Sequence, residues 1–515
     1  MNLIQKQDIK TLGWLFVIYM VLLIIWGYSY GHNNSIQLVP YAQYLNDNSL
    51  FPNDLFIQNA SKNFPNERSF FMFLIQPFGS AMEWVVFIEH VIFSLLLLFA
   101  LFKIAKHLLQ TDLYAYATII ILFFPLLFHT LGLNELHSIE FSATLASDTM
   151  SAWAILAWLQ GKNARSYIFL IISTLFHPLA GFQVFLLISG TLFFISLRQK
   201  TFKNYLKTIV PLIAVYFFTA GIFIYSLNGR LNDIPFDSAD FFRIFFVFRN
   251  AHHYIPGHFV LKDIIMLTPV YLLTPYLLYK YNKNVFVFSI LILIGCVFYT
   301  LGVEFIKSPV IAEAQWFKTT IWLEFFAIIG VLLFLQNLMP KLKITKYARQ
   351  FFAALLIICT GWTIIVFPGI HVIKNDISYE FPFYTKLTPE IDISIQAKNL
   401  TPVDALFIQP CSFDELKNYG QRSSYVDYKA LTHTKSFIQE WAKRFEEVYS
   451  INPLTSTAIS FDAVDLADEN FHNITAEKLA ELKANAGITH IIISSNVDIP
   501  FRVIASNTEY TIYEL

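Results

Sequence analysis

The sequence predicts a polytopic α-helical membrane protein with about eleven transmembrane helices, followed by a C-terminal soluble α/β domain. Three observations predict this class. The 515 residues are 56% hydrophobic and 17% aromatic but only 14% charged, a composition typical of membrane proteins. Apolar runs of about 20 residues recur up to position 370. Beyond it charges are spread throughout and no spanning run occurs. We expect a multi-span domain over 1–370, with a long first outer loop at 30–83, and a soluble domain over 371–515.

Each expected span is an apolar run long enough to cross a bilayer as a helix. The runs lie near 11–29, 84–102, 113–131, 141–160, 166–181, 182–197, 207–227, 263–280, 285–303, 317–336 and 350–369. The HPLAG segment at 177–181 interrupts one long run, and its proline and glycine mark either a tight turn between two short helices or a kink in one helix. Two helices fit the charge pattern, because Arg165 and Arg198 then both lie in inner loops. The first run lacks a small-residue cleavage site, so we expect it to be retained.

Lysine and arginine gather in alternate loops, which predicts the orientation. These residues are Lys6 and Lys10; Lys103 and Lys106; Lys162 and Arg165; Arg198, Lys200, Lys203 and Lys207; Lys280 and Lys283; and Lys341, Lys343, Lys346 and Arg349. By the positive-inside rule these loops are cytoplasmic, with the N-terminus inside and the C-terminus outside. We expect a multi-pass protein of a bacterial inner (plasma) membrane, with its soluble domain on the outer side.

Net charge, cysteine content and the missing motifs argue against several kinds of partner, cross-link and substrate. The formal net charge of −1 gives no reason to expect nucleic acid as a partner. The three cysteines offer no disulfide framework. A nucleotide-binding motif is missing from the sequence, so a cytosolic nucleotide-sugar is not expected as a direct donor.

The acids and bases of the membrane domain converge on the outer loops. The first loop fits an amphipathic helix whose apolar face is Ile36, Val39, Tyr41 and Leu45. Asp47 and Asp54 follow in the turn-forming NDNSLFPND segment. The later outer loops carry Asn134, Glu135 and His137; Arg230, Asp233, Asp237, Asp240 and Arg243; and Glu304, Lys307, Glu313, Gln315 and Lys318.

The stretch at 249–259, RNAHHYIPGHF, is the strongest candidate site. It places Arg249 and three histidines between apolar runs, and ionisable residues beside membrane spans indicate a functional site because charge there is costly. The alternative is that a loop between two spans must be polar somewhere, and histidine and tyrosine sit comfortably at the interface. Because other polar loops lie on the same side, we predict that this loop binds a ligand.

Carboxylates and cations in these loops suit glycosyl and phosphate chemistry. Asp47 or Asp54 could act as a general base toward an acceptor hydroxyl, or hold a divalent cation such as Mg²⁺ or Mn²⁺. Alternatively, both are turn residues. Arg243, Arg249 and Lys318 could neutralise a diphosphate, with arginine favoured because its fork binds two oxygens at once.

The histidines complete the predicted substrate-binding and phosphate-binding set. His252, His253 and His258 could ligate a metal or serve as acid and base near neutral pH. Adjacent histidines lack the i, i+4 spacing of a helical metal pair. Tyr254 and His177 belong to the same predicted set.

Glu324 is expected within the tenth span. A buried carboxylate needs a partner or a wet cavity. Lys318 lies six positions earlier, too far along a helix for a direct pair.

The residues after 370 read as a small α/β layer domain. Helices are expected at 390–400, 436–448 and 476–485, and strands in DALFIQP, AGITHIIISS, FRVIAS and YTIYEL. The RSSYVDYK segment at 422–429 is expected at an ordinary salt-bridged edge, with contact to the membrane domain or a substrate as the alternative.

The layout resembles the GT-C class of membrane glycosyltransferases, in which many spans precede an outer soluble domain and a long first outer loop carries acids. YGHNNSIQ with LFPNDLF, HPLAG, RNAHHYIPGHF, QWFK, TPVDALFIQP and RSSYVDYK also resemble a family of uncharacterised bacterial polytopic membrane proteins. GT-C enzymes usually place an acid just after the first span, whereas this chain has His32, Asn33 and Asn34 there, and Asp47 is its first acid.

The GT-C resemblance implies transfer of a sugar from a polyprenyl-phosphate donor at the outer membrane face, with an acid of the first loop as base. The expected partners are membrane lipid and lipid-linked sugar. Two other functions remain open: a lipid-linked glycan ligase, polymerase or flippase-like protein that uses the basic loops without a carboxylate base, and a non-catalytic membrane scaffold whose C-terminal part binds a partner.

Overall fold

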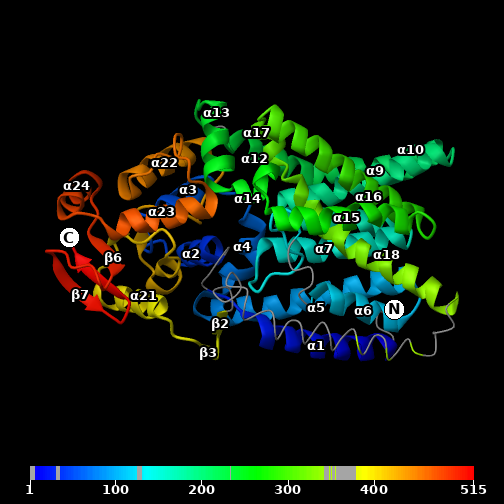
Figure 1. Ribbon diagram of the computed structural model, residues 1–515, viewed down its shortest axis with the longest axis horizontal. Helices are drawn as coiled ribbons and strands as arrows, with labels where there is room; N and C mark the ends of the chain where they lie inside the picture. The colour runs from blue at the N-terminus through cyan, green and yellow to red at the C-terminus, as the bar shows by residue number, and fades with distance from the viewer. Residues whose placement is uncertain are drawn as a thin grey trace.

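The structure is a computed structural model that describes residues 6–30, 35–123, 130–231, 233–341 and 378–515, together with positions 347, 350 and 354. It is elongated (Figure 1): a bundle of roughly parallel helices fills one end, and the strands and helices of residues 378–515, which we call the tail, lie at the other. The first outer loop lies between the two parts, close to the tail.

Apolar helices make up the bundle. They are α1 (Lys6–Trp26), α5 (Met82–Leu109), α6 (Asp112–Phe123), α7 (Ala143–Leu159), α8 (Asn163–Phe176), α9 (Pro178–Arg198), α10 (Phe202–Thr208), α11 (Val210–Tyr216), η2 (Phe217–Gly221), α12 (Ile222–Leu231), α15 (Leu261–Leu278), α16 (Lys283–Thr300), η5 (Leu301–Phe305) and α18 (Thr320–Lys341). Short helical turns at the outer end are α13 (Ser238–Phe241), η3 (Phe242–Arg249), α14 (Ala251–Tyr254), η4 (Pro256–His258), α17 (Pro309–Glu313) and η6 (Trp316–Thr319).

Seven helices among the described residues are long and apolar enough to cross a membrane. Shorter apolar helices occur at Ser69–Gly79, Asp112–Phe123 and Asn163–Phe176. The first ten expected spans overlap helices of the bundle; the run at 207–227 is divided among α10, α11, η2 and α12, and the described helix of the run at 113–131 is α6. The eleventh, at 350–369, falls outside the described residues apart from positions 350 and 354. The predicted fold class, a polytopic helical membrane protein with a C-terminal α/β part, is confirmed.

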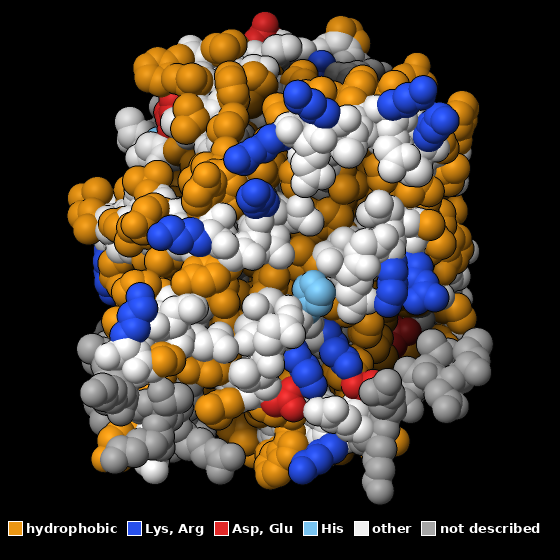
Figure 2. Space-filling model, turned by 90° about the vertical axis from the view of Figure 1, so that its right-hand side faces the viewer, with side chains coloured by type: hydrophobic (Ala, Val, Ile, Leu, Met, Phe, Trp, Pro, Cys, Tyr) orange, Lys and Arg blue, Asp and Glu red, His pale blue; other side chains and the backbone are white. Residues whose placement is uncertain are grey.

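Lysine and arginine gather at the end of the bundle that lies farthest from the tail. Figure 2 shows this end, where blue side chains stand among orange ones and few red ones appear. The positive-inside rule associates such a basic end with the cytoplasmic face.

The HPLAG segment is a tight turn between two helices, as the charge pattern favoured. His177 is both the C-cap of α8 and the N-cap of α9. A Cβ atom on Gly181 would lie 2.3 Å from the backbone nitrogen of Thr174. Only glycine permits this close approach of α8 and α9.

The first outer loop folds into α2 (Ser35–Asn46), α3 (Leu55–Lys62), α4 (Ser69–Ile75) and η1 (Gln76–Ala81). The expected amphipathic helix is α2, which buries Ile36, Val39 and Tyr41. This loop therefore packs against the rest of the molecule instead of extending into solvent.

The tail contains a mixed five-stranded sheet. Its helices and strands are α21 (Pro389–Leu400), β4 (Leu406–Ile408), η9 (Leu416–Gly420), β5 (Ser423–Ser424), α22 (Lys435–Tyr449), α23 (Ser460–His472), α24 (Ala476–Ala486), β6 (His490–Ser494), β7 (Arg502–Ser506) and β8 (Tyr510–Glu514). The strand order is β5-β4-β6-β8-β7, with the first three strands parallel and the last two antiparallel. A separate small sheet pairs β1 (Gly27–Tyr28) at the end of the first span with β2 (Ser378–Phe381), and β2 with β3 (Tyr384–Thr385).

The segment at 422–429 is salt-bridged, as expected, through Asp427 with Lys417 and Lys429 with Asp414, but most of it is buried and does not form an ordinary exposed edge. Arg422 is only 6% exposed and donates to the carbonyl oxygens of Lys398 and Thr401 at 2.6 Å each. Asp427 is 7% exposed. The reason is that this segment runs between the sheet of the tail and the first outer loop, where both sides exclude water.

A buried lysine joins these two parts. Lys417 Nζ lies 2.6 Å from Asp427 Oδ2 and 3.7 Å from Asp54 Oδ2, and both Lys417 and Asp54 are almost fully buried. Asp54 also accepts a hydrogen bond from the backbone nitrogen of Ser424, 3.2 Å away. Burial alone would lower the pKa of Lys417, but Asp427 and Asp54 outweigh it and raise the pKa. Lys417 therefore stays charged and links the tail to the first outer loop through Asp54.

Replacing Lys417 with methionine tests this contact. The variant keeps the side-chain length but leaves two buried carboxylates without their cation, so we expect the free energy of unfolding to fall by about 3–5 kcal/mol. Denaturation of the purified protein in detergent, followed by tryptophan fluorescence, measures the change. Lys443→Met is the matched control, because the Lys443–Glu447 pair is exposed on α22 and its loss should matter by no more than about 0.5 kcal/mol. Equal stability of the two variants would contradict the role of Lys417.

Candidate functional site

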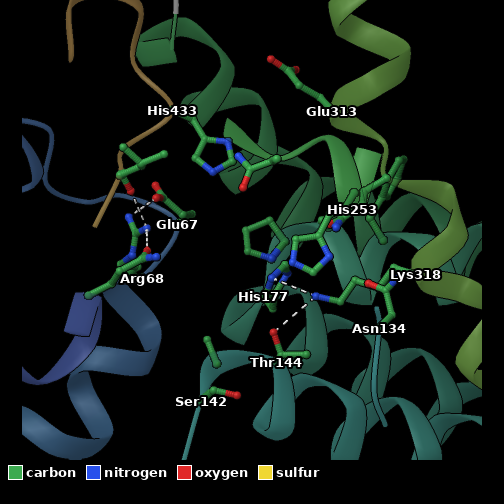
Figure 3. A pocket seen from close by; sticks show the side chains of 18 of the residues that line it. Glu67, Arg68, Asn134, Ser142, Thr144, His177, His253, Glu313, Lys318 and His433 are labelled. Atoms are coloured by element: carbon green, nitrogen blue, oxygen red, sulfur yellow. Dashed lines mark hydrogen bonds and ion pairs between the residues drawn. The ribbon is translucent and has the colours of Figure 1, made fainter. Parts of the chain in front are cut away.

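A cavity of about 850 Å³ lies where the outer ends of the helices meet the tail. Its lining residues come from the first outer loop, residues 133–145, the α8–α9 turn, η2 and α12, residues 245–254, residues 313–318 and tail residues 429–433. Figure 3 shows the polar side chains that point into it. Segments far apart in the sequence thus converge on one hollow, as the distribution of ionisable residues predicted.

Lys318 is a cationic group of the cavity and lies next to a neutral His177 ring, because burial and the charge of Lys318 lower the pKa of His177 well below its usual value. Lys318 Nζ donates to Thr144 Oγ1 at 3.3 Å and lies 3.5 Å from His177 Nε2 (Figure 3). His177 Nδ1 accepts from the backbone nitrogen of Ala180 at 3.3 Å, which leaves the ring proton on Nε2. Two donors therefore face each other, an arrangement that suits an anion placed between or beside them.

Two helix N-termini face the same pair of residues. Ser142 caps α7 by accepting from the backbone nitrogen of Leu145 at 3.2 Å, and the following Ala143 and Thr144 line the cavity. His177 caps α9, whose first residue, Pro178, also lines it. The partial positive charge at the start of a helix favours a bound anion. Helix ends and cationic side chains thus favour the same ligand charge.

Arg249 connects the cavity to the tail. Its guanidinium carbon lies 3.9 Å from the centroid of the Tyr428 ring, and Nε donates to the Tyr428 carbonyl oxygen at 2.5 Å. Nη1 donates to Asn250 Oδ1 at 2.8 Å. The Tyr428 hydroxyl in turn donates to the Arg249 carbonyl oxygen at 3.0 Å. Arg249 lines the cavity while these bonds hold its orientation.

A second polar group occupies the other end of the cavity. Arg68 pairs with Glu67 and also donates to the carbonyl oxygen of Leu431 in the tail at 2.9 Å (Figure 3). Burial alone would raise the pKa of Glu67, but Arg68 and His433 outweigh it and hold the pKa below its usual value. Glu67 is therefore an ionised, weakly basic carboxylate.

One wall of the cavity is apolar and belongs to a lipid-facing span. Phe217, Gly221, Ile224 and Tyr225 line the cavity from η2 and α12. Tyr225 is also 80% exposed on the outside of the bundle. A Cβ atom on Gly221 would lie 2.9 Å from Phe217 Cδ1, so the glycine leaves space next to that ring.

The structure brings five of the predicted site residues to the cavity: Arg249, His253, Tyr254, Lys318 and His177. His253 Nδ1 lies 2.7 Å from the carbonyl oxygen of Gly132, which fixes the ring at the cavity wall. The Tyr254 ring packs against Phe246 with centroids 5.0 Å apart.

The two predicted catalytic aspartates do not reach the cavity. Asp47 is exposed and accepts from the backbone nitrogen and hydroxyl of Ser49, at 3.0 and 2.6 Å. Asp54 caps α3 by accepting from the backbone nitrogen of Ile57 at 2.9 Å, and it belongs to the Lys417 cluster. Asp47 therefore occupies a turn position, which the sequence offered as the alternative, whereas Asp54 is a helix cap, which was not predicted.

Arg243, His252 and His258 also lie away from the cavity. Arg243 donates to the carbonyl oxygens of Leu454, at 3.2 Å, and Ser456, and so binds the tail. His252 and His258 line a separate pocket of about 180 Å³. Burial, with His253 and Arg249 nearby, lowers the pKa of His252 to about 2. His252 is therefore a neutral ring that offers no charge to a phosphate.

Sequence reasoning did not single out the carboxylates that line the cavity, which are Glu67, Glu135 and Glu313. For Glu135 the sequence does contain a signal of a site, because this residue follows Asn134 in a loop directly after an apolar run. For His433 no local pattern gives a signal, since it enters from the tail. Among the described residues, no group of three or more His, Cys, Asp or Glu side chains is arranged to hold a metal ion.

Replacing Lys318 with methionine tests the anion site. Removing the ammonium group takes away a charged hydrogen-bond donor worth about 1.5–3 kcal/mol, so we expect the affinity for a phosphate-bearing amphiphile to fall roughly 10- to 150-fold. Titration of the purified protein with a fluorescent lipid monophosphate measures the dissociation constant. Lys262→Met, which removes an exposed charge outside the cavity, is the matched control. An equal loss in both variants would point to surface charge instead of this site.

Comparison with known families finds a domain of unknown function (DUF6798) at residues 390–448, within the tail. No curated protein matches the chain.

Among solved structures, the chain is similar to ArnT from Cupriavidus metallidurans bound to undecaprenyl phosphate, with 13% identity over 98% of both chains and a TM-score of 0.48. It is also similar to the oligosaccharyltransferase of Archaeoglobus fulgidus. The apo form of that protein gives 12% identity over 96% of this chain and 70% of the other, with a TM-score of 0.46. Its complex with zinc and sulfate gives 11% identity over 94% of this chain and 67% of the other, with a TM-score of 0.41. These are proteins of the GT-C class that the sequence resembles.

Proposed function

We propose that this protein transfers a sugar from a lipid-phosphate donor to an acceptor at the outer face of a membrane. One observation supports this proposal above all: a single cavity combines an apolar wall on a lipid-facing span with an anion site at Lys318 and His177. A soluble sugar phosphate would need no such wall, and a neutral lipid would need no such anion site.

The two halves of the cavity suit the two halves of a lipid-linked donor. The phosphate would lie at Lys318, His177 and the start of α7 and α9, where hydrogen-bond donors and helix dipoles already point inward. The lipid chain would leave past Gly221 and Tyr225 into the bilayer. The preorganised donors would then stabilise the negative charge that grows on the phosphate as it leaves the sugar.

We assign the base to Glu135 because, of the three carboxylates that line the cavity, it is the one whose charge acts on Lys318 at the anion site. Neither Asp47 nor Asp54 lines the cavity. Glu67 does, but it is paired with Arg68 and its pKa is lowered, whereas a general base works best with a pKa near the working pH.

The proposed reaction is a single displacement at the anomeric carbon. An acceptor hydroxyl oxygen bonds to that carbon while its proton passes to the Glu135 carboxylate. The bond from the carbon to the donor phosphate oxygen breaks, and the phosphate keeps the electron pair. The charge of the leaving lipid phosphate is balanced by Lys318, and the neutral His177 ring donates a hydrogen bond to it.

The orientation we propose is that of an inner-membrane protein of a bacterium with its tail on the outer side. It is supported by the basic end of the bundle opposite the tail (Figure 2) and by the positive-inside rule. In this orientation the cavity lies at the outer surface, within reach of donor lipids of the outer leaflet.

Replacing Glu135 with glutamine should slow sugar transfer and spare binding. Loss of a general base typically costs about 10²- to 10⁴-fold in kcat, and the isosteric amide should leave KM for the donor nearly unchanged. Transfer of a radiolabelled sugar from its lipid phosphate by the purified protein measures both constants. Glu481→Gln, an exposed carboxylate of α24, is the matched control. Full activity of the Glu135 variant would show that Glu135 is not the base and would favour a flippase-like or ligase-like protein.

Replacing Gly221 with leucine tests the route of the lipid chain. A larger side chain meets Phe217 and narrows the apolar wall, so we expect the affinity for a long-chain lipid phosphate to fall about tenfold. The affinity for a short-chain, water-soluble analogue should stay the same. Gly13→Leu is the control, because a Cβ atom there meets nothing within 4 Å. Parallel losses for both ligands would contradict the proposed route.

A further inference from the structure

A second, smaller chamber lies beside the main cavity, deeper in the helix bundle. Its volume is about 40 Å³, and its lining comes from α1 and the following Gly27, the end of α6, residues 135–139 and α18. Glu135 and Leu136 line both spaces. These two residues therefore border both the chamber and the proposed active site.

The chamber contains buried polar atoms that the described residues leave without a hydrogen bond. Glu324 is 4% exposed and its Oε1 has no such partner within the described ranges. Tyr19 is fully buried, and its hydroxyl also has no hydrogen-bond partner within the described ranges. An unsatisfied buried polar group costs about 1–3 kcal/mol, and such groups in folded proteins are almost always bonded to protein or water.

Water fits this chamber by size and by chemistry. One water molecule needs roughly 10–15 Å³ of such space, so the chamber has room for about three. Glu324, Tyr19, His137 and Glu135 line it, which offers a water the two to four polar partners that it requires.

The polar groups continue from the chamber into α5. His137 Nε2 lies 2.9 Å from Ser94 Oγ, and its ring centroid is 5.6 Å from that of His90. His90 is fully buried, and neither ring nitrogen has a hydrogen-bond partner within the described ranges. His137, Ser94 and His90 therefore form a row of groups with exchangeable protons that begins at the chamber.

Glu324 has no cation to balance a negative charge at the chamber. No lysine or arginine is among the described residues that line it. A carboxylate within a membrane helix must pair with a cation, meet a wet cavity or be neutralised by a proton. Among the described residues, the chamber offers the second and third of these.

We propose that this chamber holds a short chain of water molecules and an exchangeable proton on Glu324, in contact with the main cavity through Glu135. A hydronium ion in the chamber gives its proton to the Glu324 carboxylate, which becomes a neutral acid and leaves one water molecule; the reverse step returns the proton. If the proposed function is right, this relay also removes the proton that Glu135 takes from the acceptor. The chamber itself does not depend on that function.

Infrared difference spectroscopy of the purified protein in nanodiscs tests this proposal without any substrate. The wild-type spectrum minus that of Glu324→Gln should contain the C=O stretching band of a protonated carboxylic acid. The band should shift to lower frequency in D₂O, because water reaches the proton. Glu89→Gln, which changes a carboxyl of α5 outside both cavities, is the matched control and should leave the Glu324 band and its shift unchanged.

Glu135→Gln tests the connection to the main cavity. We expect the Glu324 band to remain but its shift in D₂O to slow at least severalfold, because the exchangeable group between the two spaces is lost. An ionised Glu324, which a bound cation would require, or a band that does not shift in D₂O would overturn the proposal. An unchanged exchange rate in Glu135→Gln would overturn the connection. A protein that shows the band but transfers no sugar would contradict only the proposed function.

Discussion

The contact between Arg249 and Tyr428 is the interaction on which the cavity depends. It joins the end of η3, next to the membrane, to the tail through a cation–π contact and a hydrogen bond to a carbonyl oxygen. Both interactions gain strength where water is excluded. Residues 429–433 follow Tyr428 directly and form the roof. Lys417 of the tail connects the same part of the tail to the first outer loop, because it contacts both Asp427 in the tail and Asp54 in the loop.

Much of the fold could be predicted from the sequence because a bilayer imposes simple rules. A span needs a long apolar run, and the first ten predicted runs overlap helices. The charge pattern separated α8 from α9, and Gly181 shows why the turn between them is so tight. In the tail, helix caps and strand patterns predicted α21, α22 and α24 and the strands β4, β6, β7 and β8, but the helix α23 (Ser460–His472) was not predicted. The burial of Arg422 and Asp427 was missed, because no local pattern reveals which face of a loop another segment will cover.

Some residues of the candidate site were predicted from the sequence and others were not, and the difference has a physical reason. Lys318, His177 and Arg249 were found because ionisable residues beside a membrane span are rarely incidental. Asp54 was predicted to be a general base or a cation ligand. It directly precedes the helix Leu55–Lys62, however, and aspartate at this position commonly caps the helix. His433 could not be found, since it reaches the cavity only through the docking of the tail. Glu135 was noticed as a polar loop residue, but only its place between two cavities shows what it can do.

The close approach of α8 and α9 at Gly181 has a consequence for how the anion site works. The backbones touch near Thr174, so the turn that carries His177 has little freedom to move. Its imidazole, Lys318 and the start of α9 then keep their positions whether or not a ligand is bound. Such a rigid receptor loses little entropy on binding and needs no reorganisation during the reaction, so discrimination between ligands rests on shape and charge already built into the empty protein.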